Sequence, residues 1–251
     1  MSVWRLIPPL VASGVVQMAI DRWLLEQHAL GRQPAILRFY TWSPVAISLG
    51  YHQHRYPEFW QTLTWQGAAI AVVKRPSGGR AVLHQGDLTY AVITSGLTPQ
   101  RRQAYEQICR FLMMGWQTLG VTLHYGQAGR GYIHNPDCFG TATAADLVMS
   151  DGAKLIGSAQ LRRNQAILQH GSMRLQPDAA LFGQVFGSDD CHLPDWERSR
   201  AEGTPPPLPV VIAALTQAAQ QCFAMELAVQ PLTPAEWAAA VSMPLPPATP
   251  L

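Results

Sequence analysis

The segment from residue 69 to residue 93 constrains the fold most strongly. Three apolar runs, 69–75, 80–83 and 88–93, are predicted as strands, and the first two are separated by Pro76-Ser-Gly-Gly79. This sequence marks a turn, because proline cannot donate to a sheet and glycine weakens the interior of a strand. The paired glycines also let the backbone approach a ligand closely, since no Cβ stands in the way.

Helices and strands are mixed irregularly along the rest of the chain. Apolar spacing and end signals predict helices at 13–30, 98–119, 177–185, 210–223 and from 233 onward, and further strands at 35–40, 45–49, 121–125, 146–149, 154–160, 164–173 and 226–232. Thr98 is the expected N-cap of the second helix. There is no regular strand–helix–strand rhythm, so we predict an α+β fold with a largely antiparallel mixed sheet flanked by helices.

The chain is long enough for one large core with a small appendage. It has 251 residues, of which 48% are hydrophobic. We expect a main domain over residues 1–187, a helical extension packed on the same domain over 188–242, and a disordered tail over 243–251, which contains four prolines.

Composition excludes several classes of function. The net charge of +2 leaves no broad basic face for nucleic acid, and no apolar run reaches the roughly 20 residues of a membrane span. The N-terminus lacks a basic stretch followed by an apolar stretch, so no signal peptide is expected. Four scattered cysteines fit neither a zinc site nor a disulfide framework. We therefore expect a cytoplasmic protein without a metal, and with no nucleic-acid or membrane partner.

Two residues stand out as candidates for chemistry. Cys138 lies in a long polar loop, either as an accessible thiolate or as an incidental loop thiol, whereas Cys109 and Cys222 fall within predicted helices. Lys154 is one of only two lysines among 18 basic residues, and it precedes Gly157-Ser158-Ala159 on a predicted strand. Glycine inside a strand indicates a place that something must approach closely.

These groups suit acyl transfer through a thioester. Cys138 would attack the acyl carbonyl, while Lys154 and backbone N–H groups would stabilise the tetrahedral oxygen. Exchange between thioesters would require no ATP. The candidate substrate-binding residues are those of the glycine-containing segments: Arg75, Ser77, Gly78, Gly79, Arg80, His84, Gly157, Ser158, Ala159, His170 and Gly171. His170 has the alternative of being an ordinary half-buried histidine.

Four stretches in order resemble the lipoate/biotin protein ligase superfamily. They are Gln17–Asp21, the pair Leu37–Pro44 and Ser48–Tyr51, the segment Arg75–His84 with Asp87–Tyr90, and Lys154–Gln160 with Leu168–Ser172. The resemblance covers about residues 4–185. It implies a catalytic domain over residues 1–187 with the fold of biotin ligases and class II aminoacyl-tRNA synthetases.

Three features are similar to the cysteine-dependent octanoyltransferase branch of this superfamily. Arg80 follows the glycine pair, Cys138 stands eight residues before Asp146, and the extension beyond residue 187 is short. The resemblance implies octanoyl transfer from acyl carrier protein to a lipoyl-domain lysine, in 2-oxoacid dehydrogenases or the glycine cleavage H protein, with no cofactor. It also implies that Lys154 contacts the acyl carbonyl and that the 75–84 turn lines an acyl tunnel.

Two alternatives remain open at this point. An ATP-dependent lipoate ligase would use Lys154 and the glycine turn to hold an acyl-adenylate, with ATP and Mg²⁺ as cofactors and Cys138 incidental. A non-catalytic binder of acyl groups or carrier domains would need neither Lys154 nor Cys138 as a reactive group.

Overall fold

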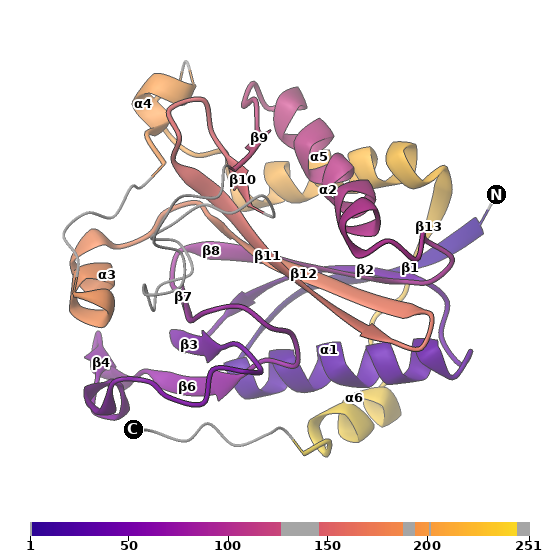
Figure 1. Cartoon of the computed structure of the whole chain (residues 1–251), viewed down its shortest axis with the longest axis horizontal. Helices are drawn as coiled ribbons and strands as arrows, with labels where there is room; N and C mark the ends of the chain where they lie inside the picture. The colour runs from indigo at the N-terminus through magenta and orange to yellow at the C-terminus, as the bar shows by residue number, and fades with distance from the viewer. Residues whose placement is uncertain (1, 127–145, 188–193, 201, 245–251) are drawn as a thin grey trace.

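The computed structural model describes residues 2–126, 146–187, 194–200 and 202–244. Its centre is an eight-stranded sheet in the order β13-β1-β2-β8-β12-β11-β10-β9 (Figure 1). The strands are β1 Ser2–Ala12, β2 Ile36–Trp42, β8 Asp87–Thr94, β9 His124–Tyr125, β10 Leu147–Val148, β11 Lys154–Arg163, β12 Ala166–Arg174 and β13 Met225–Val229. The neighbours from β2 through β9 are antiparallel, and β1 is parallel to both β2 and β13. The predicted α+β fold with a largely antiparallel mixed sheet is therefore confirmed.

Three of the predicted strands form a separate small sheet. It has the order β6-β3-β7, from β3 Ala46–Leu49, β6 Ala71–Lys74 and β7 Val82–His84. A two-stranded sheet, β4 Thr64–Trp65 and β5 Ala68–Ala69, and the 3₁₀ helix η1 Glu58–Gln61 lie in the connection between β3 and β6. The glycine turn, residues 75–80, thus connects β6 to β7, which lie on opposite sides of β3 in the small sheet.

Helices cover both faces of the large sheet (Figure 1). Helices α2 Arg101–Thr118 and α5 Leu208–Phe223 pack together on one face, around a core that includes Phe39, Tyr90 and Phe111. Helix α1 Gly14–Ala29 lies on the opposite face with α6 Pro234–Val241 against it. Two short helices, α3 Ala179–Phe186 and α4 Trp196–Ser199, follow β12 in the chain. None of the helices in the described part of the chain is both long and apolar enough to cross a membrane.

Two expectations about local structure were wrong. The strand β1 was not predicted, because Pro8 and Pro9 interrupt its pattern; in the structure its pairing with β2 shifts register between Ile7 and Leu10, which accommodates them. Thr98 is not the N-cap of α2. The helix begins at Arg101 with Gln100 as its N-cap, and the Thr98 hydroxyl bonds the Gln103 side chain at 3.3 Å.

The C-terminal part adds the edge strand β13 to the large sheet. Its helix α5 packs against α2 on one face, and α6 packs against α1 on the other. Its end is fixed by an ion pair in which Arg5 donates to both carboxylate oxygens of Glu236, at 2.7 and 2.8 Å. These hydrogen bonds lower the pKa of Glu236 to about 2. The predicted boundary at residue 187 stays a prediction, and most of the tail predicted to be disordered lies outside the described residues.

Candidate functional site

Arg75 organises the turn between β6 and β7. Its guanidinium group is buried and donates to the carbonyl oxygens of Ser48 (2.9 Å), Gly78 (2.9 Å) and Arg80 (2.6 Å). It also donates to the Ser48 hydroxyl at 3.1 Å. A planar guanidinium group has five N–H donors in a fixed fork and can bond all four of these oxygens at once, whereas a lysine ammonium has only three donors. Arg75 therefore holds the glycine turn against β3.

The turn forms one side of a narrow slot between the two sheets. Eight predicted substrate-binding residues line it together: Arg75, Gly79, His84, Gly157, Ser158, Ala159, His170 and Gly171. Ser77 is buried behind it, Gly78 lines a neighbouring cleft, and Arg80 contributes its carbonyl to Arg75. The slot has a volume of about 50 Å³, well below the roughly 300–1,000 Å³ of typical ligand pockets. An acyl chain would therefore have to displace side chains as it enters.

A serine, a histidine and an aspartate are aligned on the α1 side of the slot. Ser77 Oγ lies 2.5 Å from His170 Nε2, and His170 Nδ1 lies 2.8 Å from Asp21 Oδ2. Asp21 is fully buried and also accepts hydrogen bonds from Tyr40 and Arg38, both at 2.8 Å. Burial alone would raise the pKa of Asp21, but Arg38, His170 and Tyr40 outweigh it and the pKa is lowered. Asp21 is therefore an anion that orients His170.

A second array of the same type begins at the small sheet. Ser48 Oγ lies 2.9 Å from His84 Nε2, and His84 Nδ1 lies 2.8 Å from Asp87 Oδ2. The His84 ring stacks on Trp42 with centroids 3.7 Å apart. Burial lowers the pKa of His84 below its usual 6.5, despite the neighbouring Asp87. His84 is therefore neutral at pH 7, donates to Asp87 and accepts from Ser48.

Lys154 lies at the beginning of β11, three residues before the part of the strand that lines the slot. Its ammonium group is buried and lies 2.8 Å from Asp146 Oδ1. Cys138 and Cys191 lie outside the described residues. The residues that flank the segment containing Cys138 lie next to each other, because the N–H of Gly126 donates to the carbonyl of Asp146 at 2.9 Å. The chain therefore passes close to Lys154 at both ends of this segment.

The other two cysteines are structural. Cys109 is buried within α2, and burial raises its pKa to about 12. Cys222 is partly buried in α5, and burial raises its pKa as well. A thiol becomes a nucleophile only as the thiolate, so both are poor nucleophiles at neutral pH. Among the residues that the structure describes, no group of His, Cys, Asp and Glu could hold a metal ion.

The family model for the lipoyl protein ligase A/B catalytic domain matches residues 13–200. The chain belongs to this family. Among curated relatives, the octanoyltransferase LipM of Anoxybacillus flavithermus is 36% identical over 195 residues, which are 73% of this chain and 69% of the relative. The octanoyltransferase LipM of Symbiobacterium thermophilum is 39% identical over 191 residues, again 73% and 69%.

Solved structures of the family show the same fold. The protein Ta0514 of T. acidophilum with bound lipoic acid superposes with a TM-score of 0.77 at 19% identity, covering 96% of this chain and 93% of that one. A lipoate-protein ligase A bound with ATP gives a TM-score of 0.76 at 21% identity, with the same coverage. The family match and the octanoyltransferase relatives confirm the resemblance to the lipoate/biotin protein ligase superfamily and to its octanoyltransferase branch.

Sequence reasoning missed much of the lining of this slot. Met18, Tyr40, Trp42, Ser48, Val82, Thr89 and Ser172 also line it. It also missed the buried network that supports the slot, in which Gln17 and Asp21 project from α1 to contact Arg38. Their spacing of four on an otherwise apolar helix face was an available signal, because two polar groups there must have partners.

Gly50 sets how closely the loop after β3 can approach the glycine turn. A Cβ at Gly50 would lie 1.8 Å from the carbonyl oxygen of Gly79, whereas a Cβ at Gly78 would meet nothing within 4 Å. We expect Gly50→Ala to lower the free energy of unfolding by about 3 kcal/mol, the upper end of the usual cost of overpacking. Chemical denaturation with Gly78→Ala as the matched control checks this, since that variant should change stability by less than about 0.5 kcal/mol. Equal stability of the two variants would contradict the close approach.

Proposed function

We propose that this chain transfers octanoyl from acyl carrier protein to a lipoyl-domain lysine through a thioester at Cys138. The similarity to curated octanoyltransferases over 73% of the chain supports octanoyl transfer in lipoate biosynthesis as the activity. The donor, the acceptor and the covalent intermediate are our proposals. The acceptor belongs to the lipoyl domains of 2-oxoacid dehydrogenases or to the glycine cleavage H protein.

The position of Lys154 carries the proposal. Its buried ammonium begins the strand whose next residues, Gly157 to Ala159, line the slot. Asp146, its ion-pair partner, directly follows the segment that contains Cys138. A cation in such a place stabilises the negative oxygen that develops when a carbonyl is attacked, and it is worth more there than in water. The same cation favours the thiolate form of a nearby cysteine.

The proposed reaction has two balanced steps. In the first, the Cys138 thiolate attacks the carbonyl of the carrier-bound octanoyl group; a new C–S bond forms, the old one breaks, and the carrier leaves as a thiolate that takes up a proton. In the second, the amine of the acceptor lysine attacks the Cys138 thioester, an amide forms, the amine loses a proton and the Cys138 thiolate is restored. The first step exchanges one thioester for another of similar free energy of hydrolysis, and the second converts a thioester into a more stable amide. The proposed reaction therefore requires neither ATP nor Mg²⁺.

The slot residues have supporting roles in this scheme. The arrays Ser77–His170–Asp21 and Ser48–His84–Asp87 are hydrogen-bonded within the protein, so these histidines and serines present partnered polar groups to an apolar chain. Partnered groups cost little when water leaves the slot, whereas unpartnered ones would cost about 1–3 kcal/mol each. Gly79, Gly157 and Gly171, which line the slot, would present backbone rather than side chain to the acyl chain.

Mass spectrometry after incubation with octanoyl-acyl carrier protein alone tests the proposal. We expect one octanoyl adduct, released by neutral hydroxylamine as a thioester is, on the peptide that contains Cys138. The peptides of Cys109 and Cys222 serve as internal controls, because their raised pKa values keep them as thiols. An acceptor that becomes octanoylated while no adduct forms would contradict the intermediate. Lipoylation of the acceptor from free lipoate and ATP would instead identify a ligase.

A further inference from the structure

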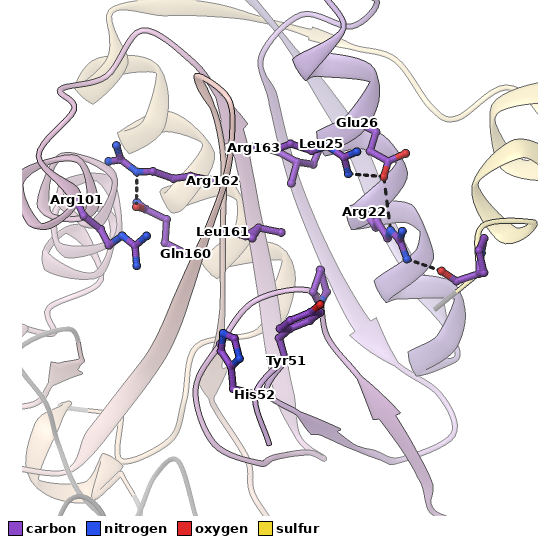
Figure 2. Close-up of a pocket in the computed structure, with 13 residues that line it drawn as sticks. Arg22, Leu25, Glu26, Tyr51, His52, Arg101, Gln160, Leu161, Arg162 and Arg163 are labelled. Atoms are coloured by element: carbon purple, nitrogen blue, oxygen red, sulfur yellow. Dashed lines mark hydrogen bonds and ion pairs between the residues drawn. The ribbon is translucent and has the colours of Figure 1, made fainter. Parts of the chain in front are cut away.

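A wide cleft lies beside the slot, and the glycine turn and β11 contribute to the walls of both. Its volume is about 890 Å³, and Figure 2 shows side chains of α1, of the loop at Tyr51 and His52, of the start of α2 and of the end of β11 around it. Pro76 and Gly78, on either side of Ser77, belong to its wall, and Gln160 directly follows Ala159 of the slot. The cleft and the slot are therefore neighbours along both the glycine turn and β11.

The cleft is strongly basic. Four arginines line it, Arg22, Arg101, Arg162 and Arg163, against one carboxylate, Glu26. This gives a formal charge of +3 in a chain whose total is +2. The charge of the cleft thus exceeds the net charge of the whole chain, and the charges of all other residues sum to −1.

The arginines are only partly neutralised. Glu26 is shared between Arg163, at 2.7 Å, and Arg22, at 3.6 Å. Arg162 donates to the carbonyl of Pro99 at 2.8 Å and to Gln160 Oε1 at 3.2 Å, both of them neutral groups. Arg101 is exposed at the first position of α2, and none of the ion pairs among the described residues includes it. The cleft therefore suits an anionic ligand.

The distance between Lys154 and the cleft indicates which substrate carries the anionic group. Gln160 is six residues along β11 from Lys154, which corresponds to about 20 Å at about 3.3 Å per residue. The lysine of an acceptor reaches only about 6 Å from its own backbone, given bonds of about 1.5 Å. A phosphopantetheine arm is roughly three times as long by the same bond lengths, and it ends in a phosphodiester anion.

We propose that this cleft binds the donor, acyl carrier protein, by holding the phosphate of its phosphopantetheine arm. The inference rests on the proposed function, because it takes Lys154 as the point where the thioester reacts. Arg101 and Arg162 contact the phosphate on one side of β11. The pair Arg22 and Arg163, joined through Glu26, supplies positive charge on the other side (Figure 2).

Arg101→Glu and its neighbour Arg102→Glu form a matched pair for the test. Both residues are exposed on the first turn of α2, but Arg102 pairs with Glu106 and does not line the cleft. We expect Arg101→Glu to raise the KM for octanoyl-acyl carrier protein about tenfold, because reversing a charge at a binding site acts on encounter and affinity. Arg102→Glu should leave that KM within about twofold, since it lies outside the site. Arg101→Ala, which removes the charge without reversing it, should give an intermediate rise.

A second donor separates the possible outcomes. Octanoyl-N-acetylcysteamine has the same thioester but no phosphate and no protein, so its kcat/KM should be equal in both glutamate variants and in the unchanged protein. Equal KM values for the carrier in both variants would overturn the proposal, as would a rise in the KM for the lipoyl domain instead. If neither donor acylates any of the proteins, the proposed function itself has failed, which is a different result from a failure at the cleft alone.

Discussion

Replacing Lys154 with methionine is expected to slow octanoyl transfer about 10²–10³-fold, the usual cost of removing one group that stabilises a developing oxyanion. Methionine keeps much of the length and the apolar stem of lysine but has no charge. The loss should already appear in the rate of thioester formation, because negative charge develops on the carbonyl oxygen in that attack, as it does again when the acceptor amine attacks. Single-turnover measurement of octanoyl loading from the carrier checks this directly.

The variant Lys154→Met needs a control because the ion-pair partner of Lys154 is also buried. The Lys154 ammonium nitrogen lies 2.8 Å from Asp146 Oδ1, and both side chains are at most 5% exposed. Removing only the lysine takes away the cation that faces this buried carboxylate, which costs about 3–5 kcal/mol of stability. The double variant Lys154→Met with Asp146→Asn removes that charge, so it should regain stability without regaining activity. Restored transfer in the double variant would show that Lys154 acts only through the fold.

Asp21→Asn is expected to lower the free energy of unfolding by about 3–5 kcal/mol, because it leaves the fully buried Arg38 without its carboxylate. Urea denaturation measures this. Tyr40→Phe is the matched control, since it removes a single hydrogen bond to the same carboxylate and should cost only about 0.5–1.5 kcal/mol. Equal losses in the two variants would contradict the role of Asp21 as the partner of Arg38.

The effect of Asp21 should depend on pH with a definite sign. Its pKa in the folded protein is below the ordinary value of 3.8, so the unfolded chain binds a proton there first as the pH falls. The stabilisation from Asp21 is therefore fully present above pH 3.8 and is lost as the pH falls through the lower pKa of the folded state. The difference in stability between the unchanged protein and Asp21→Asn should be constant near neutral pH and shrink in acid below 3.8. A difference that grew in acid would contradict the lowered pKa.

Local signals in the sequence identified most of the secondary structure and the slot. The Pro76–Gly79 turn, the Asp151-Gly152 pair between two strand patterns and the spacing of Thr233 and Glu236 are signals that depend only on neighbouring residues. The structure has the turn, a hairpin between β10 and β11, and a capping box at Thr233. Five of the eight predicted lining residues converge because β11 and β12 pair directly, with Ala159 opposite His170: Gly157, Ser158, Ala159, His170 and Gly171. A hairpin of this kind is set by its turn and its pattern of alternation, both of which are visible in the chain.

Which distant side chains contact these lining residues was decided only by the tertiary structure. His170 contacts Asp21 across 149 positions, and the slot joins strands of two different sheets. The basic cleft likewise assembles Arg22, Arg101 and Arg162 from two helices and a strand, although the net charge of +2 indicates no basic region. Sequence determines which residues carry charge and how each segment folds locally. Which distant side chains meet depends on how the sheets and helices pack, and no local pattern encodes that packing.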